Sequence, residues 1–124
     1  MTATRKLDAL TDRRRSARVE NRGVLKAEML SDAAPLTVHD FSSGGFSVLS
    51  AVPFLVGDVQ RFRITPRDGQ PVILSAAVVH SHRYSRHRHG DEYLTGLTFT
   101  DVDARKQAAI DDLLDRLTSG LSFE

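Results

Sequence analysis

Short stretches of alternating apolar and polar residues, separated by turns that contain glycine or proline, run from Gly23 to Thr100. In the first stretch, Leu25 and Ala27 alternate with charged residues, which is the period-2 pattern of a β-strand with one buried face. Six such strands are predicted, at Gly23–Leu30, Leu36–His39, Phe46–Leu49, Val59–Thr65, Val72 to about Tyr84, and Tyr93–Thr100. Because no helical period interrupts them, the pattern favours an antiparallel barrel or sandwich.

After Thr100 the period of the apolar residues changes from that of a strand to that of a helix. Asp101 and Asp103 suit the start of a helix, where their charge complements the macrodipole, and Gly120 suits its end. The spacing predicts one amphipathic helix over residues 103–119, which covers the β body or contacts a partner. Its apolar stripe consists of Ile110, Leu113, Leu114, Leu117 and Leu121.

Two connections between strands have distinctive sequences. The pair Asp68-Gly69 predicts a tight hairpin turn, because glycine tolerates the positive φ angle that such a turn requires. The polar stretch Ser85–Glu92 predicts a loop before the last strand.

The composition limits the classes of protein to which the chain can belong. A chain of 124 residues forms one domain with a single core, and the absence of cysteine excludes disulfides and thiolate metal sites. No apolar run approaches the ~20 residues of a membrane span, and the N-terminus lacks the apolar region of a secretory signal. We therefore expect a cytoplasmic protein without membrane contact.

Positive charge is concentrated near the N-terminus, although the net charge is only +1. Residues 1–26 contain eight Lys or Arg and three Asp or Glu. Such a segment either contacts an anionic partner or is a solvated tail. Residues 1–22 also have few large apolar side chains, so we expect this arm to be mobile without ligand and to become ordered on binding.

Two short motifs stand out. In Arg13–Arg18, Arg14 and Arg18 have the spacing R-x-x-x-R, and Asp40–Gly45 reads D-x-S-x-x-G, with twenty-one residues between Arg18 and Asp40. Taken alone, the arginines could form one solvated face of a helix, and the second motif could be a hairpin turn.

The order, separation and position of these motifs resemble the PilZ family, and Gly96–Phe99 is similar to the Gly-x-x-Phe of that family's last strand. The resemblance covers about residues 13–117. It implies a six-stranded antiparallel β-barrel that binds cyclic di-GMP and is followed by one C-terminal helix. The implied organisation is a flexible arm (1–12) and a single domain (13–121), with a clamp loop (13–22), a barrel (23–100) and the helix. The implied ligand-binding residues are Arg13, Arg14, Arg18, Asp40, Ser42 and Gly45.

These residue types suit the chemistry of cyclic di-GMP. An arginine fork binds phosphate oxygens, or guanine O6 and N7, in a bidentate manner, and its face stacks on a base. The carboxylate of Asp40 can accept hydrogen bonds from the N1–H and N2–H groups of guanine, which adenine lacks. Ser42 adds a small donor and acceptor, and Gly45 lets the backbone approach the ligand or adopt a positive φ angle.

Four histidines, at positions 80, 82, 87 and 89, form a second cluster of interest. His80 and His82 would share one face of a strand, as a metal pair does. Neighbouring arginines at positions 83, 86 and 88 would repel a cation, and this stretch has no Asp or Glu before Asp91 that could bind a metal or orient a ligand. We therefore interpret the cluster as a solvated hairpin and expect no metal site. A weaker alternative is that Arg83, Arg86 or Arg88 adds phosphate contacts beside the barrel site.

The leading interpretation is a regulatory module that binds cyclic di-GMP, requires no cofactor and passes the signal to a protein partner. None of the motifs G-x-S-x-G, H-E-x-x-H or the P-loop occurs, so we expect no enzymatic activity. A nucleic-acid-binding barrel that uses the basic arm is the alternative, although few aromatic residues are left for base stacking. A PilZ-like structural domain that has lost its ligand is another.

Overall fold

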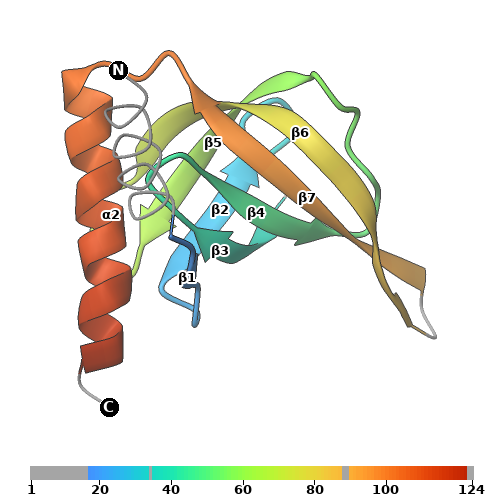
Figure 1. Cartoon of the computed structure of the whole chain (residues 1–124), viewed down its shortest axis with the longest axis horizontal. Helices are drawn as coiled ribbons and strands as arrows, with labels where there is room; N and C mark the ends of the chain where they lie inside the picture. Colours follow the sequence, from blue (N-terminus) through green and yellow to red (C-terminus); the bar gives the residue numbers. More distant parts are fainter. Residues whose placement is uncertain (1–16, 34, 88–89, 123–124) are drawn as a thin grey trace, which may run out of the picture.

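The computed structural model describes residues 17–33, 35–87 and 90–122. In this part of the chain, seven strands are followed by one helix (Figure 1). The strands are β1 (Val19–Glu20), β2 (Leu25–Met29), β3 (Pro35–Phe41), β4 (Gly45–Ser50), β5 (Val59–Pro66), β6 (Val72–His87) and β7 (Gly90–Thr100), and the helix is α2 (Ala104–Ser122). No helix among the described residues is long and apolar enough to span a membrane.

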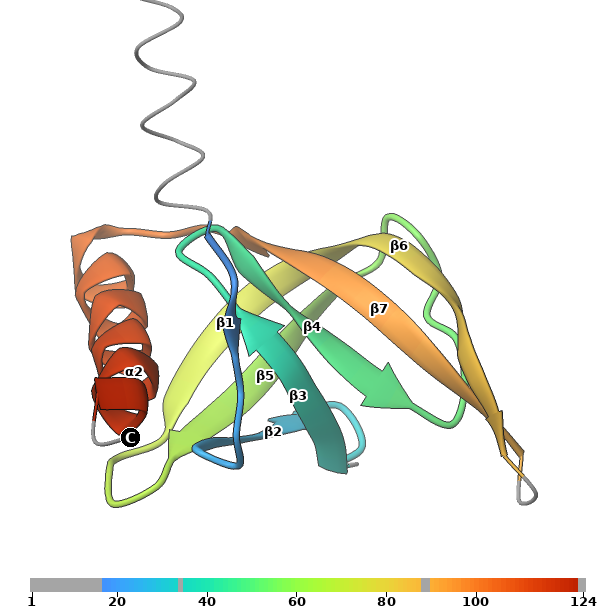
Figure 2. The ribbon, with the colours of Figure 1, turned by 60° about the horizontal axis from the view of Figure 1, so that its bottom comes forward.

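Strands β2 to β7 form a closed antiparallel barrel, which confirms the expected six-stranded fold. Their order around the barrel is β3-β2-β5-β6-β7-β4, and pairing of β3 with β4 closes the ring. The two-residue strand β1 was not predicted from the sequence. Strand β2 pairs only with Pro35 and Leu36 at the start of β3, and β1 pairs with Asp40 and Phe41 at its other end (Figure 2).

Inward-facing side chains from all six barrel strands form the core. Phe46 lies at its centre, with ring centroids 6.0 Å from Phe41, 5.3 Å from Phe62 and 5.6 Å from Phe99. Phe41, Phe46 and Phe62 are fully buried, which contributes roughly 1.5–3 kcal/mol to stability for each ring, while Phe99 is partly buried. The other buried barrel residues are Leu25, Ala27, Val38, Val48, Ile64, Leu74, Ala76, Val78 and Leu97.

The helix α2 joins the same core through Ile110, Leu113 and Leu117, which are all buried. Asp103 caps its N-terminus, as its position suggested, because its Oδ1 accepts a hydrogen bond of 2.8 Å from the backbone N–H of Lys106. The helix extends to Ser122, beyond the predicted end at residue 119. The expectation that Gly120 ends the helix is wrong, since one glycine inside a helix costs only about 1 kcal/mol.

The predicted loop Ser85–Glu92 is also wrong, because β6 and β7 remain paired almost to the tip of their hairpin. Ser85 pairs with Glu92 and His87 with Gly90. Side chains reinforce the ribbon, since Ser85 Oγ donates to Glu92 Oε1 over 3.2 Å. The hairpin extends beyond the barrel (Figure 1), where neither face is buried and polar residues are as suitable as apolar ones.

The turn between β5 and β6 is a tight hairpin, but Asp68, not Gly69, adopts the positive φ angle, at 61°. Aspartate tolerates this conformation better than most residues. Gly69 is required for another reason: a Cβ atom there would lie 2.6 Å from Cγ of Pro66 and 3.0 Å from Cζ of Arg116.

Candidate functional site

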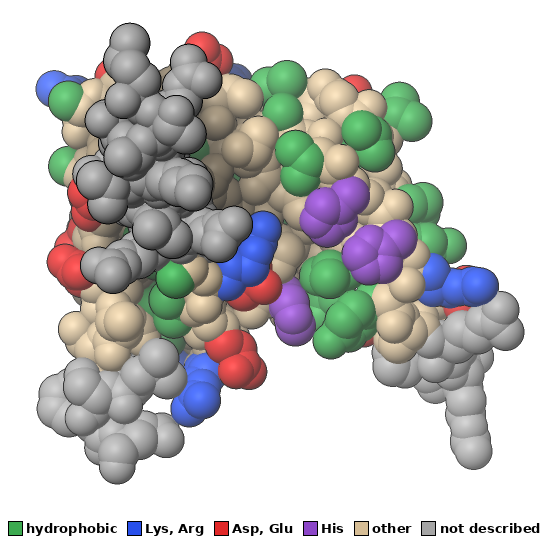
Figure 3. Space-filling model, in the orientation of Figure 1, with side chains coloured by type: hydrophobic (Ala, Val, Ile, Leu, Met, Phe, Trp, Pro, Cys, Tyr) green, Lys and Arg blue, Asp and Glu red, His purple; other side chains and the backbone are tan. Residues whose placement is uncertain are grey.

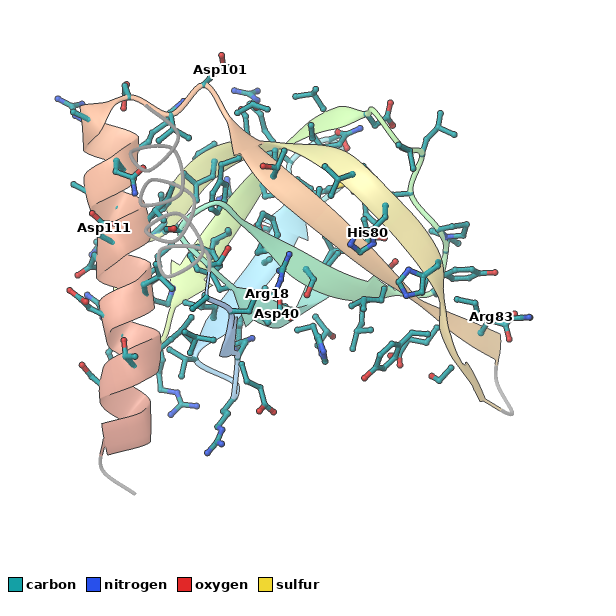
Figure 4. The ribbon with its side chains drawn as sticks, viewed as in Figure 1. Arg18, Asp40, His80, Arg83, Asp101 and Asp111 are labelled. Carbon is teal, nitrogen blue, oxygen red and sulfur yellow. The ribbon has the colours of Figure 1, made fainter. Side chains whose placement is uncertain are left out.

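The second arginine of the R-x-x-x-R motif contacts the aspartate of the D-x-S-x-x-G motif. Nη1 of Arg18 lies 2.8 Å from Oδ1 of Asp40 (Figure 4). The pairing of β1 with β3 places Glu20 opposite Asp40 and so brings Arg18 to this part of the barrel. The Arg18 side chain is 49% exposed and that of Asp40 is 21% exposed, so the pair forms a surface site. Arg13 and Arg14 lie outside the described residues.

Ser47 is a further member of the site that the motifs did not reveal. Its hydroxyl donates a 2.7 Å hydrogen bond to Oδ1 of Asp40, its partner across β3 and β4, and Ser47 itself is buried. One carboxylate oxygen thus accepts hydrogen bonds from both Arg18 and Ser47. These two contacts orient the carboxylate of Asp40, with Oδ2 not involved in either.

Ser42 stabilises the turn between β3 and β4. Its hydroxyl donates to the carbonyl of Gly45 over 3.1 Å and accepts from the N–H of Gly44 over 3.3 Å. Its backbone N–H donates to the same Gly45 carbonyl over 2.8 Å, and Ser42 is buried. The alternative reading of the motif as a hairpin turn therefore describes Ser42 well, and a ligand could reach its hydroxyl only by disturbing these bonds.

Gly45 is explained by the close approach of two strands. A Cβ atom on Gly45 would lie 1.9 Å from the carbonyl oxygen of Leu97 and 2.9 Å from the carbonyl carbon of Leu97, in strand β7. The φ angle of Gly45 is not in the positive range, so that part of the expectation is wrong. The adjacent Gly44 ties the turn to β7, since its carbonyl accepts from the N–H of Phe99 over 2.9 Å.

The strand register extends the site across the outer face of the barrel. Asp40 pairs with Ser47, Ser47 with Gly96, and Gly96 with His80. We call these four residues the Asp40–His80 row. Gly96 leaves room for the imidazole of His80, because a Cβ atom there would lie 2.3 Å from Nε2 of the ring.

Two β-bulges turn the ends of this row outward. In β3, Val38 is buried, and continued alternation would also direct Asp40 inward, but the extra residue His39 shifts the register. In β6, Leu74, Ala76 and Val78 are buried, and the extra residue Val79 likewise turns His80 outward. Each bulge therefore places a polar residue on the face where it can meet a ligand.

More imidazole and phenol rings lie beside the row. The rings of His80 and His82 are 5.5 Å apart, and those of His39 and Tyr84 are 5.6 Å apart. The histidines gather on the face that carries the Arg18–Asp40 pair (Figures 3 and 4). No group of three or more His, Asp or Glu among the described residues is arranged to hold a metal ion.

Comparisons with known proteins agree with the fold. A family model described as the PilZ domain matches residues 12–116. No curated protein sequence matches the chain. One similar solved structure is the PilZ domain of Escherichia coli YcgR with c-di-GMP (15% identity, TM-score 0.70, covering 88% of this chain and 94% of that one). Another is Bacillus subtilis MotI, an inhibitor of motility (19% identity, TM-score 0.64, covering 89% of this chain and 53% of that one).

A third similar structure is the K. pneumoniae MrkH–c-di-GMP complex (13% identity, TM-score 0.70, covering 87% of this chain and 53% of that one). The chain spans about half the length of MotI and MrkH. At these identities the structures establish the fold, while the match of the family model covers most of the sequence. The chain therefore belongs to the PilZ domain family, a family of cyclic di-GMP receptors.

Proposed function

We propose that this chain binds cyclic di-GMP on the outer face of the barrel and passes the signal to a protein partner. The observation that carries the proposal is the contact between Arg18 and Asp40, which unites the two motifs at one surface site. Two of the similar structures, from YcgR and MrkH, are described as bound to c-di-GMP, which supports the choice of ligand.

The Arg18–Asp40 pair suits guanine recognition because it is weak enough to rearrange. Exposed ion pairs contribute about 0–1 kcal/mol, whereas a charge-assisted hydrogen bond to a ligand is worth roughly 1.5–3 kcal/mol. Guanine N1–H and N2–H groups can therefore bind the Asp40 carboxylate while Arg18 turns to a phosphate or to guanine O6 and N7. Ser47 keeps the carboxylate oriented during this exchange.

The remainder of the Asp40–His80 row offers a second contact region. Asp40 and His80 are three interstrand spacings apart along the curved sheet, a path of about 14 Å that one base cannot cover but a cyclic dinucleotide can. Gly96 lets the imidazole of His80 lie close against β7, and this ring can stack on a base or donate to a phosphate.

The N-terminal arm would complete the site. Strand β1 fixes residues 19 and 20 to β3, so the chain that precedes Arg18 starts at the edge of the row. Arg13 and Arg14 are then near enough in sequence to contact the same ligand. Their ordering on binding would change the surface presented to a partner, without any chemical step, in the cytoplasm where we expect the protein to act.

The alternative of a nucleic-acid-binding barrel receives less support. Phe41, Phe46 and Phe62 are fully buried, so they cannot provide the exposed aromatic platform that single-stranded nucleic acids stack on.

Isothermal titration with cyclic di-GMP, cyclic di-AMP and GTP tests the proposal. We expect cyclic di-GMP to bind with a dissociation constant in the micromolar range or below, about −8 kcal/mol, and cyclic di-AMP to bind far more weakly. Absence of binding at ligand concentrations near a millimolar would refute it. Equal affinity for the two cyclic dinucleotides would refute the guanine-specific role of Asp40.

A further inference from the structure

A group of exposed apolar side chains lies on the connection between β4 and β5 and on the neighbouring part of β6. The exposed fractions are 73% for Leu55, 65% for Val56, 64% for Val52, 58% for Val59 and 50% for Val79. We call these five residues the β4–β5 patch. Hydrophobic side chains are visible over this connection in the upper right of Figure 3. Several exposed apolar side chains in one region of a surface commonly mark a protein interface.

The patch is held in place by hydrogen bonds to β6. The N–H of Gly57 donates to the carbonyl of Val78, and the N–H of Val78 donates to the carbonyl of Asp58, both over 2.8 Å. The N–H of Phe54 donates to Oγ of Ser81 over 3.0 Å. Val79 is the extra residue of the β6 bulge, which leaves its side chain outside the core. The apolar side chains are thus presented by a fixed backbone.

Two charged residues stand at the border of the patch. Asp58 directly precedes Val59, and Arg61 shares the outer face of β5 with Val59, because both are exposed while Phe62 is buried. Among the described residues, neither side chain forms an ion pair. The patch therefore combines an apolar centre with one carboxylate and one guanidinium that have no partner of opposite charge in the described part of the chain.

We propose that the β4–β5 patch binds a second copy of this chain and forms a two-fold symmetric dimer. A two-fold axis brings the same surface of both copies together, so an uncharged apolar centre meets its own copy without repulsion. With the axis between positions 58 and 61, Asp58 of one copy lies beside Arg61 of the other, twice. The patch supplies the apolar core of the interface, and the surrounding residues supply its rim.

The proposal does not depend on cyclic di-GMP, and its test uses no ligand. Analytical ultracentrifugation of the full chain, from about 1 to 500 µM, should show a concentration-dependent dimer. Leu55→Asp and Val56→Asp should each weaken the dimer at least tenfold. Val102→Asp is the matched control, since Val102 is an exposed valine between β7 and α2 and its replacement should leave association unchanged. Thermal melting should show that all three variants are folded.

A charge exchange tests the two-fold geometry. Asp58→Arg and Arg61→Asp should each weaken the dimer, and the double variant should restore it, because the pairs between copies are then re-formed with reversed polarity. A chain that stays monomeric throughout the range, or a dimer that survives Leu55→Asp, overturns the proposal, as does a monomer that uses the patch to bind a different protein. A dimer that the double variant does not restore contradicts the two-fold arrangement.

Discussion

Replacing Gly45 with alanine probes how closely β4 and β7 approach each other. The new Cβ atom would lie 1.9 Å from the Leu97 carbonyl oxygen, 2.9 Å from the Leu97 carbonyl carbon and 3.0 Å from Cα of Thr98. These are backbone atoms of a paired strand, so the obstacle cannot rotate away. Overpacking of this kind costs roughly 1–3 kcal/mol or more.

Gly96→Ala is the matched control, because it is the same substitution on the same pair of strands with a different obstacle. Its Cβ atom would lie 2.3 Å from Nε2 of His80, at the end of an exposed side chain that can rotate. Alanine in a strand also gains about 0.5–1 kcal/mol over glycine through reduced backbone entropy. The net effect of Gly96→Ala on the free energy of unfolding should therefore be within about 1 kcal/mol of zero.

Thermal unfolding followed by circular dichroism measures the difference. Since 1 kcal/mol corresponds to about 4 °C for a domain of this size, Gly45→Ala should lower the melting temperature by roughly 4–12 °C and Gly96→Ala should change it by less than about 4 °C. Equal shifts for both variants would refute the reasoning, because the nature of the obstructing atoms would then have no influence on stability.

Three further predictions concern the ligand and metals. Arg18→Ala and Asp40→Asn should each weaken cyclic di-GMP binding about tenfold or more. They should lower the melting temperature by only a few degrees, because an exposed ion pair contributes about 0–1 kcal/mol. The control is Arg63→Ala, which removes an ion pair with Glu28 and should bind the ligand normally. Arg14→Ala should weaken binding to a similar extent. Wild-type affinity of this variant in titration calorimetry would mean that the arm is a solvated tail with no part in binding. Zinc or nickel should not raise the melting temperature, and a stoichiometric metal in purified, untagged protein would contradict this.

The alternation of side chains was sufficient to predict the barrel strands and much of the core. In β5, Phe62 and Ile64 are buried and Arg61 and Arg63 are exposed, as the period-2 pattern indicated. Strand β1 could not be found in this way, because two residues have no recognisable period. It forms because β3 extends beyond β2 and offers unpaired backbone groups, which depends on the tertiary structure.

Only those residues of the candidate site that lie in one of the two motifs could be predicted from the sequence. Arg18 and Asp40 followed from the resemblance, and the fold brings them into contact. Ser47 and His80 belong to no motif, and their place in the same cross-strand row as Asp40 depends on the register of four strands. The polar composition of the β6–β7 hairpin led to a wrong prediction of a loop. The two strands are paired there, but outside the barrel they have no face to bury, so they do not need the alternating pattern by which strands are recognised.

The two bulges explain why counting residues along a strand cannot reveal this site. Without its bulge, β3 would direct the Asp40 side chain into the core, two residues after the buried Val38. In the same way β6 would direct His80 into the core after Val78, since a shift of one residue exchanges the two faces of a strand. Burying an unpaired carboxylate or imidazole costs several kcal/mol, so such a strand would destabilise the core. One extra residue in β3 and one between Val78 and His80 in β6 remove this conflict, and the β3 bulge also directs Phe41 into the core. Because the two bulges lie at opposite ends of one cross-strand row, the same irregularities that protect the barrel interior also create the outward-facing polar surface on which binding is proposed.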